Sequence, residues 1–135
     1  MLRDSIKQAR IAADAVLETK QMLRSSGELC SSAHFDRPIQ KGRYGDPVAE
    51  VVRIRERLRE KLQRQELYSA ACHERMVSEL EKVPSLVTRN LFMYRYYDRC
   101  TWKVAASRAG LGVQAAKMRC ERYEQKEREE DDHVA

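Results

Sequence analysis

Glycine, proline and aromatic residues are scarce in this chain of 135 residues, which has five glycines, three prolines and 7% aromatic side chains. With few turn formers and few aromatics, the chain is poorly suited to a sheet. Charged residues, in contrast, make up 35% of the sequence. We therefore predict an all-α fold built from long helices with solvated faces.

The chain also lacks the patterns of secretion, membrane insertion and metal binding. We find no signal peptide and no apolar run long enough to cross a bilayer. The four cysteines are widely spaced without a Cys-x-x-Cys pair, which disfavours both a zinc site and a disulfide framework. We predict a cytoplasmic protein that binds neither metal nor membrane, with Cys100 and Cys120 packed as small apolar residues.

Motifs for catalysis are missing as well. His73-Glu74 begins like the zinc-protease signature His-Glu-x-x-His, but Val77 stands where the second histidine belongs. The sequence contains no glycine-rich phosphate loop, no nucleophile turn and no paired carboxylates in an apolar setting. We therefore expect no enzyme activity and no cofactor.

Residues 1–24 have the apolar spacing of one helix with a narrow buried stripe. The stripe consists of Leu2, Ile6, Ala9, Ala13, Val16 and Leu23, and Lys20 interrupts one step. In residues 25–45 the pattern stops, and two Ser-Ser pairs, three glycines and one proline take its place. This composition predicts a flexible linker loop over residues 25–45.

A long central helix is predicted over residues 46–83. Asp46 suits the N-cap and Pro47 the first helical position. Steps of three and four then connect Val51, Ile54, Leu58, Leu62, Gln65, Ser69, Cys72, Met76, Leu80 and Val83. Such a narrow stripe resembles a coiled-coil seam. Its partner is either the first helix folded back antiparallel, giving a helical hairpin, or the same helix from a second copy, giving a homodimer or other homo-oligomer.

Pro84 ends the central helix, because the residue before a proline is pushed away from the α region. A C-terminal domain is predicted over residues 84–128, and an acidic tail over residues 129–135. The thickest apolar cluster of the chain lies in this domain and is its predicted core. It comprises Leu86, Val87, Leu91, Phe92, Tyr94 and Tyr96.

Within this domain, Ala106 and Gly110 have the spacing of a helix-turn-helix. The alanine allows two helices to cross closely, and the glycine takes the positive φ of the tight turn. Thr101 is the expected N-cap of the first helix, and the second helix is expected to begin near Val113. The positions that define the motif are Trp102, Ala106, Gly110, Leu111 and Ala116.

Basic charge is concentrated around this motif. The whole chain has a net charge of +5, and residues 85–123 contain eight basic side chains against two acidic ones. Phosphate neutralisation supplies most of the non-specific affinity for nucleic acid, so motif and charge together predict binding to double-stranded DNA.

The second helix of such a motif enters the major groove. If Ala116 and Cys120 face inward, the base-reading candidates on the opposite face are Val113, Gln114, Lys117, Met118 and Glu121. The predicted phosphate contacts flank the motif and are Arg95, Arg99, Lys103, Arg119 and Arg122.

A family resemblance extends this prediction. The runs Leu80-Glu81-Lys82-Val83-Pro84, Arg95-Tyr96-Tyr97-Asp98 and Thr101-Trp102, followed by Ala105-Ala106 and Ala109-Gly110, resemble region 4 of bacterial sigma factors. The chain is most similar to small phage and prophage regulators built on that module, the ArpU and RinA type of late-gene transcription regulator. The resemblance implies sequence-specific binding upstream of phage late genes and activation through contact with host RNA polymerase.

Two other classes of protein fit the same pattern. Small terminase subunits of phages join a helix-turn-helix to a helical oligomerisation segment and serve DNA packaging. A protein-binding module could also use the basic face to bind an acidic partner. A dimer is expected for a regulator and a ring of many subunits for a packaging protein, whereas steep salt dependence distinguishes DNA binding from protein binding.

Overall fold

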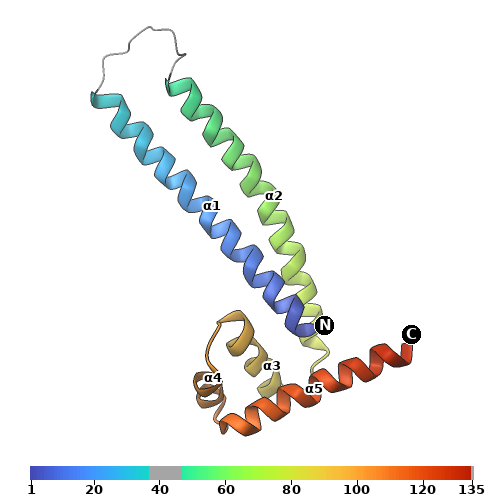
Figure 1. Cartoon of the computed structure of the whole chain (residues 1–135). Coiled ribbons are helices and arrows are strands. Elements are labelled where there is room, and N and C mark those ends of the chain that lie inside the picture. Colours follow the sequence, from blue (N-terminus) through green and yellow to red (C-terminus); the bar gives the residue numbers. More distant parts are fainter. Residues whose placement is uncertain (37–46, 135) are drawn as a thin grey trace. The chain divides into compact units, whose positions relative to one another are not determined.

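The computed structural model describes residues 1–36 and 47–134, and within these ranges it contains five α-helices, one short π-helix and no strand (Figure 1). The all-α prediction is confirmed. In chain order the elements are α1 (Leu2–Asp36), α2 (Pro47–Glu81), α3 (Leu86–Phe92), the π-helix η1 (Met93–Tyr97), α4 (Trp102–Ala109) and α5 (Val113–Val134).

The chain packs as two units, and each is described by itself. The hairpin unit comprises residues 12–69. The C-terminal unit comprises Met1–Ile11 together with the chain from Ala70 onward. The C-terminal unit therefore contains the first turns of α1 and the last turns of α2 in addition to α3, η1, α4 and α5.

In the hairpin unit, α1 and α2 run antiparallel (Figure 1). Thr19 Oγ1 donates a 2.6 Å hydrogen bond to Gln65 Oε1, and Lys20 Nζ lies 3.8 Å from the carboxylate of Glu66. Of the two partners considered for the central helix, the structure therefore shows the first helix of the same chain.

The buried stripes of the two helices differ from the predicted ones at single positions. Thr19, with 2% of its surface exposed, fills the step at which Lys20 interrupts the apolar pattern. Ile54 was expected in the seam, but it is 47% exposed and Arg55 is half-buried instead. The Arg55 guanidinium lies beside Gly27 of α1, because a Cβ at residue 27 would be in ordinary van der Waals contact with Arg55 Nη2, at 3.7 Å. The aliphatic stem of an arginine can pack while its charged end stays near the surface.

The first helix is longer than predicted, because α1 continues through Ser25, Ser26 and Gly27 to Asp36. The loop predicted over residues 25–45 was therefore wrong for residues 25–36. Ser26 Oγ donates to the carbonyl of Leu23 (2.9 Å), which satisfies the hydroxyl within the helix. A single internal glycine costs only about 1 kcal/mol relative to alanine, which a long helix tolerates. Residues 37–46, with Asp46 as the predicted N-cap, lie outside the described residues.

Every α-helix of the C-terminal unit contributes buried side chains to its core. Leu91 and Phe92 are buried as predicted, whereas Leu86, the first residue of α3, is 67% exposed and does not belong to the core. The buried apolar side chains of this unit are Leu2, Ile6, Ala9, Cys72, Met76, Val83, Leu91, Phe92, Ala105, Ala106, Ala116 and Cys120. The burial of Cys120 is as predicted.

A π-helix, which the sequence did not predict, follows α3 directly. The amide of Asp98 donates to the carbonyl of Met93 (2.9 Å), five residues back. All five residues of η1 are half-buried.

Helices α4 and α5 begin where the sequence predicted. The hydroxyl of Thr101 accepts from the amide of Val104 (3.4 Å), which confirms the predicted N-cap. Helix α5 begins at Val113 and continues to Val134, through the predicted domain boundary at residue 128 and into the acidic tail. Arg128 Nη2 lies 4.0 Å from the Glu124 carboxylate one turn earlier, a spacing that supports the helix.

Candidate nucleic-acid interface

The turn between α4 and α5 is formed by Gly110, whose φ of 73° lies in the left-handed region. This conformation was predicted from the sequence and is confirmed. The Gly110 amide donates to the carbonyl of Ser107 (3.2 Å), and the Leu111 amide donates to that of Ala106 (2.9 Å). The two bonds form a Schellman motif, which satisfies two carbonyls at the end of α4 and directs the chain into α5.

Helices α4 and α5 are in contact, and the buried residues that they contribute are small: Ala105, Ala106, Ala116 and Cys120, each exposing no more than 1% of its surface. Such side chains allow the two helix backbones to approach closely. Trp102 is half-buried and packs edge-on against Tyr96, with ring centroids 6.4 Å apart. Leu111 is also half-buried. All five motif positions therefore contribute to the packing or the turn.

The outward face of α5 carries most of the predicted base-reading side chains. Gln114, Met118 and Glu121 are exposed, and Met118 exposes 47% of its surface. Val113 and Lys117 are half-buried and lie toward the edge of this face. A ligand that meets α5 from outside would therefore first contact the three exposed side chains.

Four of the five predicted phosphate contacts are exposed and one is half-buried. Lys103, Arg119 and Arg122 are exposed on α4 and α5. Arg95 is half-buried: its Nη1 donates to the carbonyl of Cys100 (2.9 Å), and its guanidinium lies 5.4 Å from the Trp102 ring centroid. Arg95 therefore also holds the segment between η1 and α4 in place. Arg99 is exposed and adopts a φ of 58°.

Arg119 and Arg122 line an open cleft of about 650 Å³ whose charges are mixed. Its other basic residues are Lys82 and Lys126. Its acidic residues are Glu79, Glu127, Glu130 and Asp131. Because cations and carboxylates balance, this cleft is less favourable for an anion than a purely basic surface.

A second cleft, of about 330 Å³, is lined by Lys7, Arg10, Ile11, Arg95, Tyr96 and Arg99, and is called the basic cleft below. Four of its six lining residues are cationic and none is acidic. Sequence reasoning missed Lys7 and Arg10, which looked like ordinary solvated positions of the first helix. Only the packing of α1 against η1 brings them next to Arg95 and Arg99.

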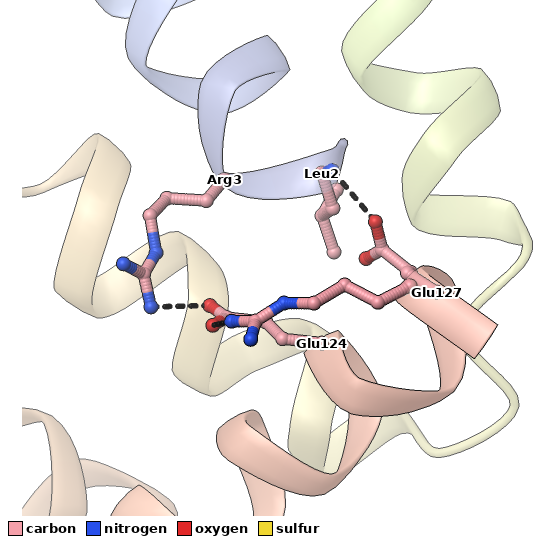
Figure 2. Close-up of polar contacts among 5 residues, drawn as sticks. Leu2, Arg3, Glu124 and Glu127 are labelled. Carbon is pink, nitrogen blue, oxygen red and sulfur yellow. Dashed lines mark hydrogen bonds and ion pairs between the residues drawn. The ribbon is translucent and has the colours of Figure 1, made fainter. Parts of the chain in front are cut away.

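Polar contacts connect the start of α1 to the middle of α5 (Figure 2). The amide of Leu2 donates to Glu127 Oε2 (3.2 Å), and the Arg3 guanidinium forms an ion pair with Glu124. Burial raises the pKa of Glu127 above the ordinary glutamate value, although the Leu2 amide and the terminal ammonium oppose this shift. These contacts fix α5 more than two turns beyond its exposed first residues.

Burial also suppresses ionisation on the inner face of α5. It raises the pKa of the Cys120 thiol to about 12, with the nearby Glu124 carboxylate adding to the effect. It raises the pKa of Tyr123 to about 12 as well. Tyr123 packs edge-on against Phe92 with centroids 5.7 Å apart. Both side chains are therefore neutral packing groups at physiological pH.

Comparisons of the chain with protein-family models, curated proteins and solved structures give no match. In the described part of the chain, no helix combines the length and the apolar character that a membrane span requires.

Proposed function

We propose that this protein is a sequence-specific regulator of transcription that binds double-stranded DNA. In this proposal α4, the Gly110 turn and α5 form a helix-turn-helix, and the start of α5 enters the major groove. The observation that carries the proposal is the outward face of α5, where Gln114, Met118 and Glu121 are exposed immediately after the Gly110 turn.

The side chains on this face have the chemistry that base recognition needs. The amide of Gln114 can bond an adenine edge at two positions, and Lys117 can donate to O6 and N7 of guanine. Val113 can contact a thymine methyl group. Lys103, Arg119 and Arg122, which are exposed beside this face, supply charge for the phosphate backbone.

The proposal includes two protein partners. The resemblance to phage late-gene regulators favours activation of late genes through contact with host RNA polymerase. The hairpin unit favours self-association, because Leu17 and Leu67 are 56% and 68% exposed. Each lies two residues from the Thr19 and Gln65 pair, so both are at the same level of the hairpin. Light scattering is expected to give twice the 15.8 kDa chain mass, and Leu17→Glu with Leu67→Glu is expected to give monomers.

Selection of bound duplexes from a random-sequence library tests DNA recognition directly. We expect one enriched sequence motif, and its occurrence upstream of phage late genes would support the regulatory role. Five phosphate contacts predict a salt slope of about −4.5, so a fourfold rise in salt should weaken binding by roughly 500-fold. A protein that recovers no enriched sequence and binds no duplex would contradict the proposal.

Charge reversal tests whether α5 is the recognition helix. Lys117→Glu with Arg119→Glu should abolish binding to the selected duplex. The matched control is Lys61→Glu with Arg64→Glu, which makes the same change of charge at two exposed positions of α2. Binding that survives the α5 variant, or that is lost equally in the control, would rule out α5 as the recognition helix.

A further inference from the structure

We propose that one side of the helical hairpin binds an acidic amphipathic helix of a partner protein. In this stretch of α2 the half-buried positions of the seam are Arg55, Leu58, Leu62, Gln65 and Ser69. The residues that come immediately before them are called the basic flank below: Ile54, Arg57, Lys61, Arg64 and Tyr68. This surface would give the chain a second function, which does not depend on DNA binding by α5.

The basic flank occupies one side of the hairpin. Thr19 contacts Gln65 in the seam. The charged groups of the next residues, Lys20 and Glu66, lie 3.8 Å apart, so residues that follow the seam positions share one side of the hairpin. Residues that precede the seam positions are rotated by about 100° in the other direction, at 3.6 residues per turn. The basic flank therefore lies on the side opposite to the Lys20 and Glu66 pair.

Three cations give the basic flank its charge. Arg57, Lys61 and Arg64 are exposed, and within the described residues none of their side chains forms an ion pair or a hydrogen bond. Steps of four and three residues place them on one face of α2, over roughly 10 Å at 1.5 Å per residue. No acidic residue belongs to the basic flank, whereas Lys20 and Glu66 neutralise each other on the opposite side. The three charges are therefore available to an external anionic group.

The facing part of α1 adds apolar surface and one carboxylate. Ala15, Glu18 and Met22 come immediately before seam residues of α1, so they lie on the same side as the basic flank. Met22 is 44% exposed, and Ile54 of the basic flank is 47% exposed. Because Glu18 can offset only one of the three cations, this side of the hairpin combines exposed apolar side chains with net positive charge.

This combination fits an acidic amphipathic helix better than a DNA backbone. Carboxylates spaced three and four residues apart on a partner helix match the spacing of the three cations, because both helices rise by 1.5 Å per residue. Apolar residues of such a helix would cover Ile54 and Met22, whereas hydrated phosphates would leave both side chains exposed to water. Charged residues beside a helical seam also determine the choice of partner in coiled coils.

Binding of a designed peptide to the full chain tests the proposal. The probe is a fluorescein-labelled helix of about 21 residues, or three heptads, with leucine at positions a and d and glutamate at e and g. A second peptide has lysine in place of each glutamate. Anisotropy should show binding of the glutamate peptide that weakens as KCl is raised, and no binding of the lysine peptide. Failure to bind the glutamate peptide would overturn the proposal.

Charge removal shows whether the peptide binds to the basic flank. Arg57→Gln with Arg64→Gln should weaken binding of the glutamate peptide about tenfold, because two ion pairs are lost. The matched control is Arg24→Gln with Arg59→Gln, since both of these arginines are exposed and follow seam positions on the opposite side. The control should retain the affinity of the unaltered chain. Equal weakening in the two variants would show attraction to the overall charge and overturn the site.

The apolar part of the surface has its own test. Met22→Ser with Ile54→Ser should weaken binding of the glutamate peptide several-fold, because less apolar surface is covered in the complex. Both residues are exposed in the free chain, so the melting temperature should not fall. Unchanged peptide affinity in this variant would contradict the docking of an amphipathic helix.

Duplex binding by the same variants distinguishes this proposal from the proposed function. Arg57→Gln with Arg64→Gln should bind the selected duplex as well as the unaltered chain does. If this variant loses duplex binding and retains peptide binding, the basic flank belongs to the DNA interface and the proposal is overturned. A chain that binds the glutamate peptide through the basic flank but binds no duplex would contradict the proposed function alone.

Discussion

The hydroxyl of Thr19 donates a hydrogen bond to the side-chain carbonyl of Gln65 across the seam of the helical hairpin, at 2.6 Å. This pair accounts for two positions at which the apolar pattern weakens, one on each helix. Thr19 is 2% exposed and Gln65 is half-buried, so each polar group needs its partner.

Breaking this pair from one side should destabilise the hairpin. Thr19→Val leaves the Gln65 amide in the seam without its donor, which typically costs about 1–3 kcal/mol. Adding Gln65→Leu should restore most of the lost free energy of unfolding, because both side chains in the seam are then apolar. Urea unfolding of the two single variants and the double variant measures the coupling. The control is the exposed pair of Lys20 and Glu66, both changed to alanine, for which we expect a coupling energy below about 0.5 kcal/mol. A coupling energy as large for this pair as for Thr19 and Gln65 would contradict the prediction.

Gly110→Ala should destabilise the C-terminal unit by about 1 kcal/mol. The φ of Gly110 is 73°, and a Cβ there would meet nothing within 4 Å, so the cost is one of backbone conformation alone. Thermal unfolding followed by circular dichroism is the measurement. Gly112→Ser is the matched control: its added Cβ also meets nothing within 4 Å, and its carbonyl accepts from Ala116 at the start of α5. Serine suits that N-cap position, so the control should be neutral or slightly stabilising.

Glu127→Gln should change the pH dependence of stability. Burial raises the pKa of Glu127 in the folded chain above the ordinary value of 4.5, so the folded state holds this proton more tightly than the unfolded state. The associated stabilisation is complete below pH 4.5 and is lost as the pH rises through the folded pKa. The melting temperature of the glutamine variant, relative to the unaltered chain, should therefore rise between about pH 4 and neutrality.

The control for this pH effect is Glu129→Gln, which removes the same charge from an exposed position of α5. The melting temperature of this control variant, relative to the unaltered chain, should not rise between about pH 4 and neutrality. A Glu127→Gln curve parallel to that of the unaltered chain at every pH would show that burial of this carboxylate has no influence on stability.

Cysteine alkylation should follow burial. Cys100 is half-buried, whereas Cys120 is buried and its pKa is raised to about 12, so its thiol stays protonated even in mildly alkaline buffer. Treatment of the native protein with iodoacetamide, followed by mass spectrometry of peptides, should find Cys100 modified well before Cys120. Both should react at similar rates in urea. Rapid native modification of Cys120 would contradict the packing of α5.

Local signals made much of the fold predictable. The Thr101 hydroxyl caps α4 three residues away and Gly110 acts through its own backbone, so both roles could be predicted without knowing the tertiary structure. The spacing of three and four residues likewise identified the buried face of each long helix. The end of α1 was missed because Ser25, Ser26 and Gly27 resemble a loop, yet they cost too little to stop a long helix.

The remaining features depend on contacts between distant segments. Arg55, and not Ile54, is half-buried in the seam, and its guanidinium lies beside Gly27 of the facing helix. Lys7 and Arg10 join Arg95 in one cleft only because α1 packs beside η1. Contacts between residues far apart in the sequence leave no periodic pattern. The apolar spacing therefore predicted the candidate base-reading face of α5 but not the basic cleft.

Helix α5 combines an exposed beginning with an anchored middle on one uninterrupted rod. From Val113 to Glu124 the rod rises by roughly 16 Å, at 1.5 Å per residue. A tilt of about 5° around the Leu2 and Arg3 contacts would shift the leading tip by roughly 1.5 Å at that length, which in the proposed complex is enough to misalign a hydrogen bond to a base. The Leu2 amide and the Arg3 side chain, at the opposite end of the sequence, therefore help to determine the position of Gln114.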